Sequence, residues 1–238
     1  MIGFFTDEIE YEYPHPPISI HILIFVEDAI RYAWNILAQH PPPRFDLQTA
    51  SEKMITLALL NVLEKLRQAN VIDGFNSINF ETVIREGNLT NYNGKHPDKE
   101  PDLVFRLCEI REGTQKLQDG VITECKPIDG NHPVGSSYCK AGLIRFVNGD
   151  YAWAMQSGLM IGYVSGNYTI YPKLSDALQK DHRVYNTKKM PYICQQSKRL
   201  KKEPTVYVTI HDRIWKYPST GKKAQTIEIR HLWLKVKD

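Results

Sequence analysis

Two short apolar runs, each marked by charged residues, restrict the fold of this chain more than any other feature. Residues 103–110 follow the dipeptide Pro101-Asp102, and residues 121–128 contain the tripeptide Glu124-Cys125-Lys126. Both runs are rich in β-branched and other apolar residues that favour strands, and glycines lie between them. The sequence therefore predicts an antiparallel β-hairpin with a turn within residues 111–120.

The predicted pairing brings three charged side chains together. Successive strand residues point to opposite faces, so Glu124 and Lys126 share one face. Paired residues have numbers that add to about 226, which sets Asp102 roughly opposite Glu124 at a Cβ separation of about 5 Å. Two carboxylates this close repel each other without a counter-ion, and Mg²⁺ binds one or two carboxylates while keeping water for substrate phosphate. We therefore expect a site that cleaves phosphodiester bonds.

Pro-Asp followed by Glu-x-Lys resembles the signature of the PD-(D/E)XK superfamily, which includes restriction endonucleases and DNA-repair nucleases. The resemblance covers residues 52–164. It implies that Asp102, Glu124 and the backbone carbonyl of Cys125 bind Mg²⁺, for which Mn²⁺ can substitute. It also implies that Lys126 orients or deprotonates the attacking water and stabilises charge on the phosphoryl oxygens. The metal would lower the pKa of bound water and clamp the phosphate.

Glu52 has two interpretations. Members of this superfamily often place a further glutamate on the helix before the sheet, where it contacts a second metal or a metal-bound water, and Glu52 has that place in the order. However, Thr49-Ala50-Ser51-Glu52 also fits a capping box, in which Thr49 caps the helix and Glu52 reaches back to its amide. One carboxylate cannot do both in full, and we expect Glu52 to join the site as a metal ligand.

Periodicity and chain breakers predict an α/β fold with a restriction-endonuclease-like core, a central mixed sheet flanked by helices in the order α-β-β-β-α-β. A C-terminal β-hairpin extends this core. The predicted helices lie at residues 20–39, 50–69, 137–156 (one helix or a pair) and 174–180, and the predicted strands at residues 79–85, 103–110, 121–128, 159–164, 205–217 and 224–236.

We expect one globular unit with three parts. Residues 1–45 form an N-terminal arm and helix, residues 46–166 the nuclease core, and residues 167–238 a basic β extension packed on that core. The N-terminal arm is rich in Tyr, Pro and acidic residues, and three prolines stop its helix after residue 39.

Charge is distributed unevenly along the chain. Residues 180–238 contain fifteen Lys or Arg and five Asp or Glu, whereas the first 179 residues contain fifteen basic and twenty-two acidic residues. This asymmetry suits a protein that binds a cation in one part and a polyanion in another, although a basic segment is also compatible with a solvated loop. The candidate nucleic-acid contacts are Arg145, Gln156, Lys198, Arg199, Lys201, Lys202 and Arg213.

Composition favours a cytoplasmic protein. The chain is 42% apolar and 24% charged, and its four cysteines have no Cys-x-x-Cys spacing. The most apolar window, residues 18–30, is too short to span a bilayer and contains acidic residues. We therefore expect no membrane partner and a reducing compartment.

The sequence predicts a Mg²⁺-dependent deoxyribonuclease, with DNA rather than RNA as the substrate. Restriction, repair and anti-phage defence all fit. Specificity would come from loops, from the C-terminal hairpin, from a homodimer or from a partner protein, because no helix-turn-helix or zinc finger is visible. The alternative is a nucleic-acid-binding or assembly module on the same fold that uses the basic C-terminal hairpin without catalysis.

Overall fold

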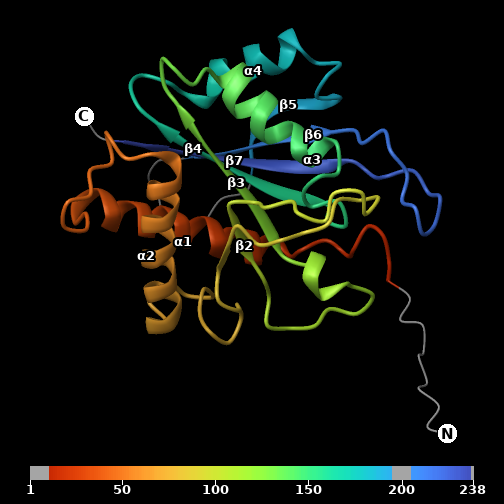
Figure 1. The fold of residues 1–238 in the computed structure, drawn as a ribbon, viewed down its shortest axis with the longest axis horizontal. Helices are drawn as coiled ribbons and strands as arrows, with labels where there is room; N and C mark the ends of the chain where they lie inside the picture. The colour runs from red at the N-terminus through yellow and green to blue at the C-terminus, as the bar shows by residue number, and fades with distance from the viewer. Residues whose placement is uncertain (1–10, 195–204, 237–238) are drawn as a thin grey trace, which may run out of the picture.

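The computed structural model describes residues 11–194 and 205–236. In these residues a mixed β-sheet of seven strands forms the centre of the protein, with helices on both faces (Figure 1). The strand order across the sheet is β1-β2-β3-β4-β7-β6-β5. The chain is therefore an α/β protein, as predicted. The elements are α1 (Ile20–Gln39), α2 (Glu52–Ala69), β1 (Ile84–Arg85), β2 (Leu103–Phe105), the 3-10 turn η1 (Lys116–Gln118), β3 (Val121–Ile128), the π-helix η2 (Val134–Leu143), α3 (Ile144–Val147), β4 (Ser157–Val164), α4 (Ile170–Lys180), β5 (Thr187–Ile193), β6 (Val206–His211) and β7 (Ile227–Lys235).

The central strands β3, β4 and β7 run parallel to one another, and the outer strands pair antiparallel. Parallel neighbours need crossover connections, which η2 with α3 supplies between β3 and β4. Strands covered on both faces are apolar at nearly every position, and β4 and β7 are buried along almost their whole length. Their composition explains why they occupy the middle of the sheet.

The predicted C-terminal hairpin is present, because β6 and β7 pair antiparallel. It does not pack on the core as a separate layer, however. β7 pairs with β4 over eight residues. The strands of the hairpin are therefore part of the same sheet as the core strands. β7 lies between β4 and β6, and its near-continuous burial follows from the helices that cover both faces of the sheet there. β5, which sequence patterning missed, adds the outermost strand beyond β6.

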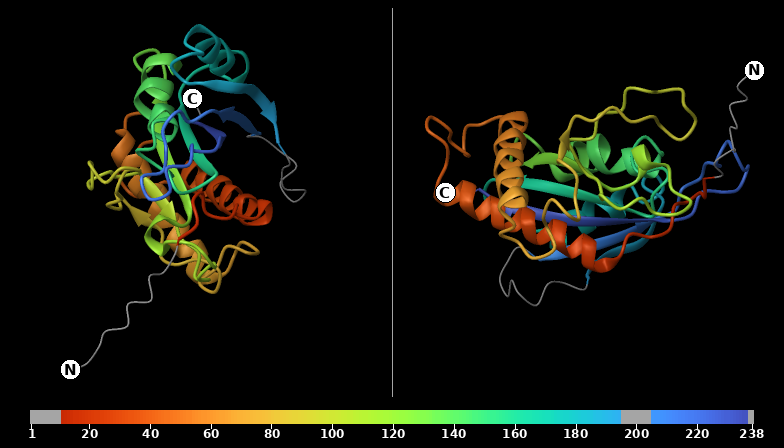
Figure 2. Two further views of the ribbon diagram at one scale, coloured as in Figure 1. Left: turned by 90° about the vertical axis from the view of Figure 1, so that its right-hand side faces the viewer. Right: turned by 90° about the horizontal axis from the view of Figure 1, so that it is seen from below.

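The helices divide between the two faces of the sheet (Figure 2). α1 and α2 pack together on one face, where Trp34 of α1 stacks on Tyr163 of β4. η2, α3 and α4 lie on the other face, where Tyr138 of η2 contacts His231 of β7. α1 has the predicted bounds. No helix in residues 11–194 and 205–236 is long and apolar enough to cross a membrane.

Several predicted elements are shorter than expected, and the strands predicted at residues 103–110 and 205–217 are reduced to β2 and β6. The strand predicted at residues 79–85 is reduced to β1 and an isolated bridge between Phe80 and Leu107. The helical region predicted at residues 137–156 ends with α3 at Val147, because Gly149 has a φ of 76° and breaks the helix. Residues between α3 and β4 form a buried loop instead.

A neutral hydrogen-bond network fixes η2 over the sheet. Tyr138 contacts His231 at 2.9 Å, His231 contacts Thr209 at 2.8 Å, and Thr209 contacts His211 at 2.7 Å. His211 must donate through Nδ1, since this atom lies 2.8 Å from the carbonyl of Tyr185. Thr209 therefore donates to His211 and accepts from His231. Burial lowers the pKa of His211 to about 4, so the network remains uncharged at neutral pH.

Candidate functional site

The site lies just before the start of β2, beside β3. Leu103 pairs with Thr123, which confirms the predicted register and sets Asp102 level with Glu124. Pro101 has no backbone N–H and ends the strand. Beyond this point, no strand among the described residues pairs with this edge of β3. The backbone N–H of Cys125 instead donates a hydrogen bond of 2.7 Å to Oδ2 of Asp102.

The edge of β3 beyond Asp102 stays open for a simple reason. Along a strand, backbone N–H groups alternate between the two edges, so residue 127 faces the same edge as Cys125. Residue 127 is Pro127, which has no N–H to satisfy. The carbonyl of Cys125 points to this same edge as its N–H, toward Asp102. The backbone atom predicted as a metal ligand therefore faces the site.

Three carboxylates surround the ammonium of Lys126. Its Nζ lies 2.9 Å from Oε1 of Glu124, 3.0 Å from Oε1 of Glu52 and 3.9 Å from Oδ2 of Asp102. The four residues come from β3, the residue before β2 and the first turn of α2. The structure thus brings together all four predicted catalytic residues. Three carboxyl groups therefore share one ammonium.

Glu52 takes part in this cluster and not in a capping box. The N-cap of α2 is Ser51, whose side chain accepts from the N–H of Met54. The alternative cap at Thr49 is therefore not formed, and Glu52 is the first helical residue, too early to reach back to the cap amide. Its side chain instead accepts a hydrogen bond from Lys126. Burial raises the pKa of Glu52, and Lys126 opposes this effect.

Glu124 is the most buried member of the cluster, with a side chain that is 1% exposed. Burial, and then the charge of Asp102, raise the pKa of Glu124 to about 8. Its Oε1 forms ion pairs with Lys126 and Arg145, but its Oε2 has no hydrogen-bond partner among the described residues. A buried carboxylate oxygen without a donor is costly, which makes it a place where a cation or a proton is favoured.

Lys126 and its carboxylates stabilise one another. Burial alone would lower the pKa of Lys126, but the charges of Glu124, Glu52 and Asp102 outweigh burial and raise it to about 12. The ammonium is therefore charged at neutral pH. In this arrangement Lys126 is a fixed cation within an acidic cluster.

Arg145 adds a second cation at the rim. Its Nη1 lies 3.2 Å from Oε1 of Glu124 and donates a hydrogen bond of 2.5 Å to the hydroxyl of Tyr151. That hydroxyl donates in turn to the carbonyl of Glu100, next to the Pro-Asp motif, at 2.8 Å. Arg145 is 40% exposed, so part of its guanidinium faces solvent. Tyr151, which positions Arg145, was missed by the sequence analysis, since no local pattern links it to Glu100.

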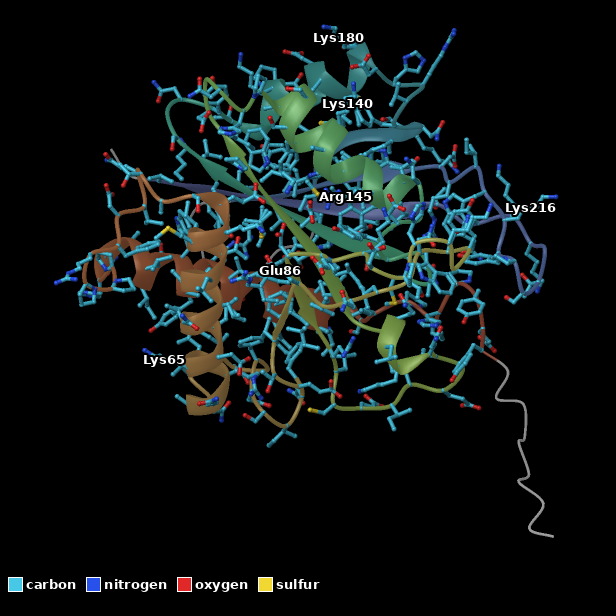
Figure 3. The ribbon with its side chains drawn as sticks, in the orientation of Figure 1. Lys65, Glu86, Lys140, Arg145, Lys180 and Lys216 are labelled. Carbon is cyan, nitrogen blue, oxygen red and sulfur yellow. The ribbon has the colours of Figure 1, made fainter. Side chains whose placement is uncertain are left out.

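One side of the cluster is closed by η2. A Cβ added to Gly142 of η2 would lie 2.7 Å from Cε of Met160 and 3.3 Å from Cγ of Lys126. Glycine is required here because the π-helix lies directly on the site. Figure 3 shows Arg145 and Glu86 in the central part of the view, where β3 passes between α2 and the segment of η2 and α3.

Other predicted contacts do not join the site. The prediction that Arg213 binds nucleic acid is wrong, because this residue is fully buried and donates to the carbonyls of Gln225, Ala152 and Trp153. Gln156 donates to the carbonyl of His15 at the opposite end of β4. The basic residues Lys198, Arg199, Lys201 and Lys202 lie outside the described residues.

The donor set fits a hard cation in chemistry. It consists of carboxylate oxygens, one of them buried without a hydrogen-bond donor, together with the Cys125 carbonyl at the open edge. Within the described ranges, however, no three His, Cys, Asp or Glu side chains converge on a common point suited to a metal ion. The reason lies in the geometry above, since the carboxylates surround the Lys126 ammonium. A cation would have to displace Lys126 from between them.

Comparisons with known proteins leave the site to be interpreted from its own geometry. No protein-family model, no curated protein and no solved structure matches the chain.

Proposed function

We propose that this protein is a metal-dependent nuclease of PD-(D/E)XK type that hydrolyses phosphodiester bonds, with DNA as its substrate. The observation that supports the proposal is the cluster of Asp102, Glu124 and Glu52 around Lys126 at the open edge of β3. The elements from α2 to β4 follow the α-β-β-β-α-β order that accompanies this signature. We place the activity in the cytoplasm, because all four cysteines are free thiols.

The residues of the cluster would divide the work as follows. Asp102, Glu124, Glu52 and the carbonyl of Cys125 would hold Mg²⁺, for which Mn²⁺ can substitute. The bound ion would lower the pKa of a coordinated water and neutralise charge on the phosphate. Lys126, once released from its carboxylates, donates hydrogen bonds to the attacking water and to the phosphoryl oxygens.

Arg145 would contact the phosphate from the rim. Its guanidinium is partly exposed and carries several N–H donors, a geometry that suits phosphate oxygens. Tyr151 holds it by accepting one hydrogen bond, and the carbonyl of Glu100 fixes Tyr151. This chain of contacts ties the phosphate-binding group to the loop that carries Asp102.

The test is a nuclease assay on supercoiled plasmid, linear duplex, single-stranded DNA and RNA, each with Mg²⁺, Mn²⁺ or EDTA. We expect cleavage of DNA with either metal and none with EDTA. Asp102→Ala and Lys126→Ala should each reduce the rate by about 100-fold or more, since even outer partners of metal ligands cost about 10- to 100-fold. Metal-dependent cleavage that survives Asp102→Ala would refute the assignment.

A matched control separates loss of the site from loss of the fold. Glu27 is also a buried glutamate paired with a cation, but it lies on the other face of the sheet. Glu27→Gln should keep metal-dependent cleavage at temperatures where it is folded, whereas Glu124→Gln should lose it. In a thermal denaturation assay, Mg²⁺ or Mn²⁺ should raise the melting temperature of the wild type and of Glu27→Gln, but not that of Glu124→Gln.

The second candidate is a nucleic-acid-binding or assembly module without catalysis. It is favoured by the position of Lys126, which fills the space between the carboxylates in the described structure. In this case the folded protein binds DNA equally well with Mg²⁺ or EDTA and cuts nothing. Neutralising Lys201 and Lys202 should then weaken binding and reduce its dependence on salt. A homodimer or a partner protein would supply specificity in either case.

A further inference from the structure

A second concave site lies away from the carboxylate cluster. It is a pocket of about 610 Å³ at the carboxyl end of β7, between the second half of α1, the start of α4 and the start of β6. Its volume is in the range of small-molecule sites, about 300–1,000 Å³. Its lining residues are Trp34, Asn35, Ala38, Tyr168, Thr169, Ile170, Tyr171, Thr205, Tyr207, Trp233 and Lys235. None of them belongs to the cluster around Lys126.

The inner wall of the pocket is aromatic and rigid. Trp34 is 4% exposed, donates a hydrogen bond of 3.0 Å to the carbonyl of Lys235, and stacks on Tyr163 with an interplanar angle of 9°. Trp233 is also 4% exposed and packs edge-on against Tyr138. Both indoles are held from behind by the core. The buried indoles therefore form a rigid floor, and the accessible aromatic surface of the pocket comes from Tyr168, Tyr171 and Tyr207.

The rim of the pocket is polar and carries positive charge. Tyr171 is 64% exposed at the start of α4, and Tyr207 is half-buried on β6. Among the described residues that line the pocket, Lys235 is the one charged side chain, and it is exposed. Asn35 and Thr169 add exposed hydrogen-bonding groups. The described lining residues thus carry one positive charge and no carboxylate.

These properties together define one class of ligand. Flat aromatic walls favour a planar π system, because offset or edge-on contact between rings adds to the burial of apolar surface. A single lysine at the rim is a point charge suited to a phosphate. We propose that this pocket binds a free mononucleotide, with the base against Tyr171 and Tyr207 and the phosphate at Lys235. The inference does not depend on the proposed nuclease activity.

The test is isothermal titration calorimetry of the full chain with AMP or CMP, in EDTA so that no metal bridges the ligand to the carboxylate cluster. We expect saturable binding with one site per chain. Adenosine, which lacks the phosphate, should bind about tenfold more weakly. Ribose 5-phosphate, which lacks the base, should show no saturable binding. Equal binding of ribose 5-phosphate and AMP would overturn the proposal, because the site would then recognise only an anion.

Variants assign the binding to this pocket. Lys235→Ala should weaken AMP about tenfold and leave adenosine unchanged, and Tyr171→Ala should weaken both ligands by a few fold to tenfold. The controls are Lys65→Ala and Tyr32→Ala, which remove an exposed lysine from α2 and a tyrosine of α1 that is 38% exposed. Glu124→Gln should bind AMP like the wild type, whatever its nuclease activity.

Two further outcomes would contradict the pocket. Binding of AMP that Lys65→Ala weakens as much as Lys235→Ala would place the ligand elsewhere or make it nonspecific. Single-stranded oligonucleotides that bind through Lys235 while mononucleotides do not would identify a nucleic-acid surface in place of a nucleotide site. Absence of heat or of saturation with every nucleotide would exclude the proposal.

Discussion

Each face of the sheet buries one glutamate beside cations, and the two sites are built differently. On the α1 face, Glu27 is 1% exposed and pairs with Arg230, which is 2% exposed. Its neighbour Asp28 has a cation of its own, Arg31, at 2.9 Å. On the η2 face, Glu124 shares Lys126 with two other carboxylates.

The difference lies in pairing and in access to solvent. At Glu27 the buried acids pair with Arg230 and Arg31, and Arg230 also pairs with the partly exposed Glu228 at 3.0 Å. The Glu27–Arg230 pair is sealed between α1 and the sheet, an arrangement that serves the fold. Around Lys126 the acids outnumber the adjacent cations, and Asp102, Glu52 and Arg145 are partly exposed. A protein that needed only stability would have no reason to concentrate like charges where solvent can reach them. This partly exposed group of acidic side chains points to a ligand.

The largest expected contrast is in stability. Glu27→Gln leaves the buried guanidinium of Arg230 without its closest acid, so the free energy of unfolding should fall by about 3 kcal/mol. Glu124→Gln removes a carboxylate that repels Asp102, and the free energy of unfolding in EDTA should change by less than about 1 kcal/mol. Urea denaturation followed by circular dichroism measures both. Equal losses would show that the two glutamates serve the fold alike.

Local pattern and pairing arithmetic were sufficient to predict one part of the site. The alternation of Glu124 and Lys126, and the register that aligns Asp102, are properties of neighbouring strands that spacing alone determines. Residues Ile20–Gln39 and Val121–Ile128 were found for the same reason, because their periodicity is strong and proline bounds the helix. Glu52 required tertiary structure, since only packing shows which of its two interpretations applies.

Other features depend on contacts that no local pattern encodes. Arg213 looked like a surface cation on an alternating strand, but Trp153, Trp215 and Tyr217 enclose it in an aromatic cluster. Tyr151 meets Glu100, fifty-one residues earlier in the chain, through a single hydrogen bond. β5 was missed because Pro191 interrupts a polar strand, which is tolerated only near a sheet edge.

The pH dependence of the free energy of unfolding gives a second contrast, of intermediate size. The pKa of Glu124 is about 8 in the folded protein, against an ordinary value of 4.5. Between pH 4.5 and 8 the folded protein therefore keeps a proton on Glu124 that the unfolded chain has lost. The folded state therefore binds more protons, and stability falls as the pH rises from about 4.5 to 8, by at most about 1.4 kcal/mol per pH unit.

Comparison with Glu124→Gln isolates this contribution, because all other groups titrate in both proteins. Denaturation in EDTA at several pH values should show that the wild type loses stability relative to Glu124→Gln as the pH rises through this window. The raised pKa of Lys126, about 12, acts only above pH 10.5 and does not interfere. Parallel curves for the two proteins would mean that Glu124 is already ionised when the protein is folded, with its charge fully compensated by Lys126 and Arg145.

The smallest expected effect concerns Tyr151, and it distinguishes positioning from packing. Tyr151→Phe keeps the buried ring and its edge contact with Phe146, but removes the hydroxyl that accepts from Arg145 and donates to Glu100. One such hydrogen bond contributes about 1 kcal/mol, so metal-dependent cleavage should slow by about fivefold with stability reduced by a similar amount. Arg145→Lys in the Tyr151→Phe background should add little beyond Arg145→Lys alone, because both changes disturb the same group. Fully additive losses in this double-mutant cycle would show that Tyr151 acts independently of Arg145. Tyr151 would then not hold Arg145 in position at the rim of the cluster.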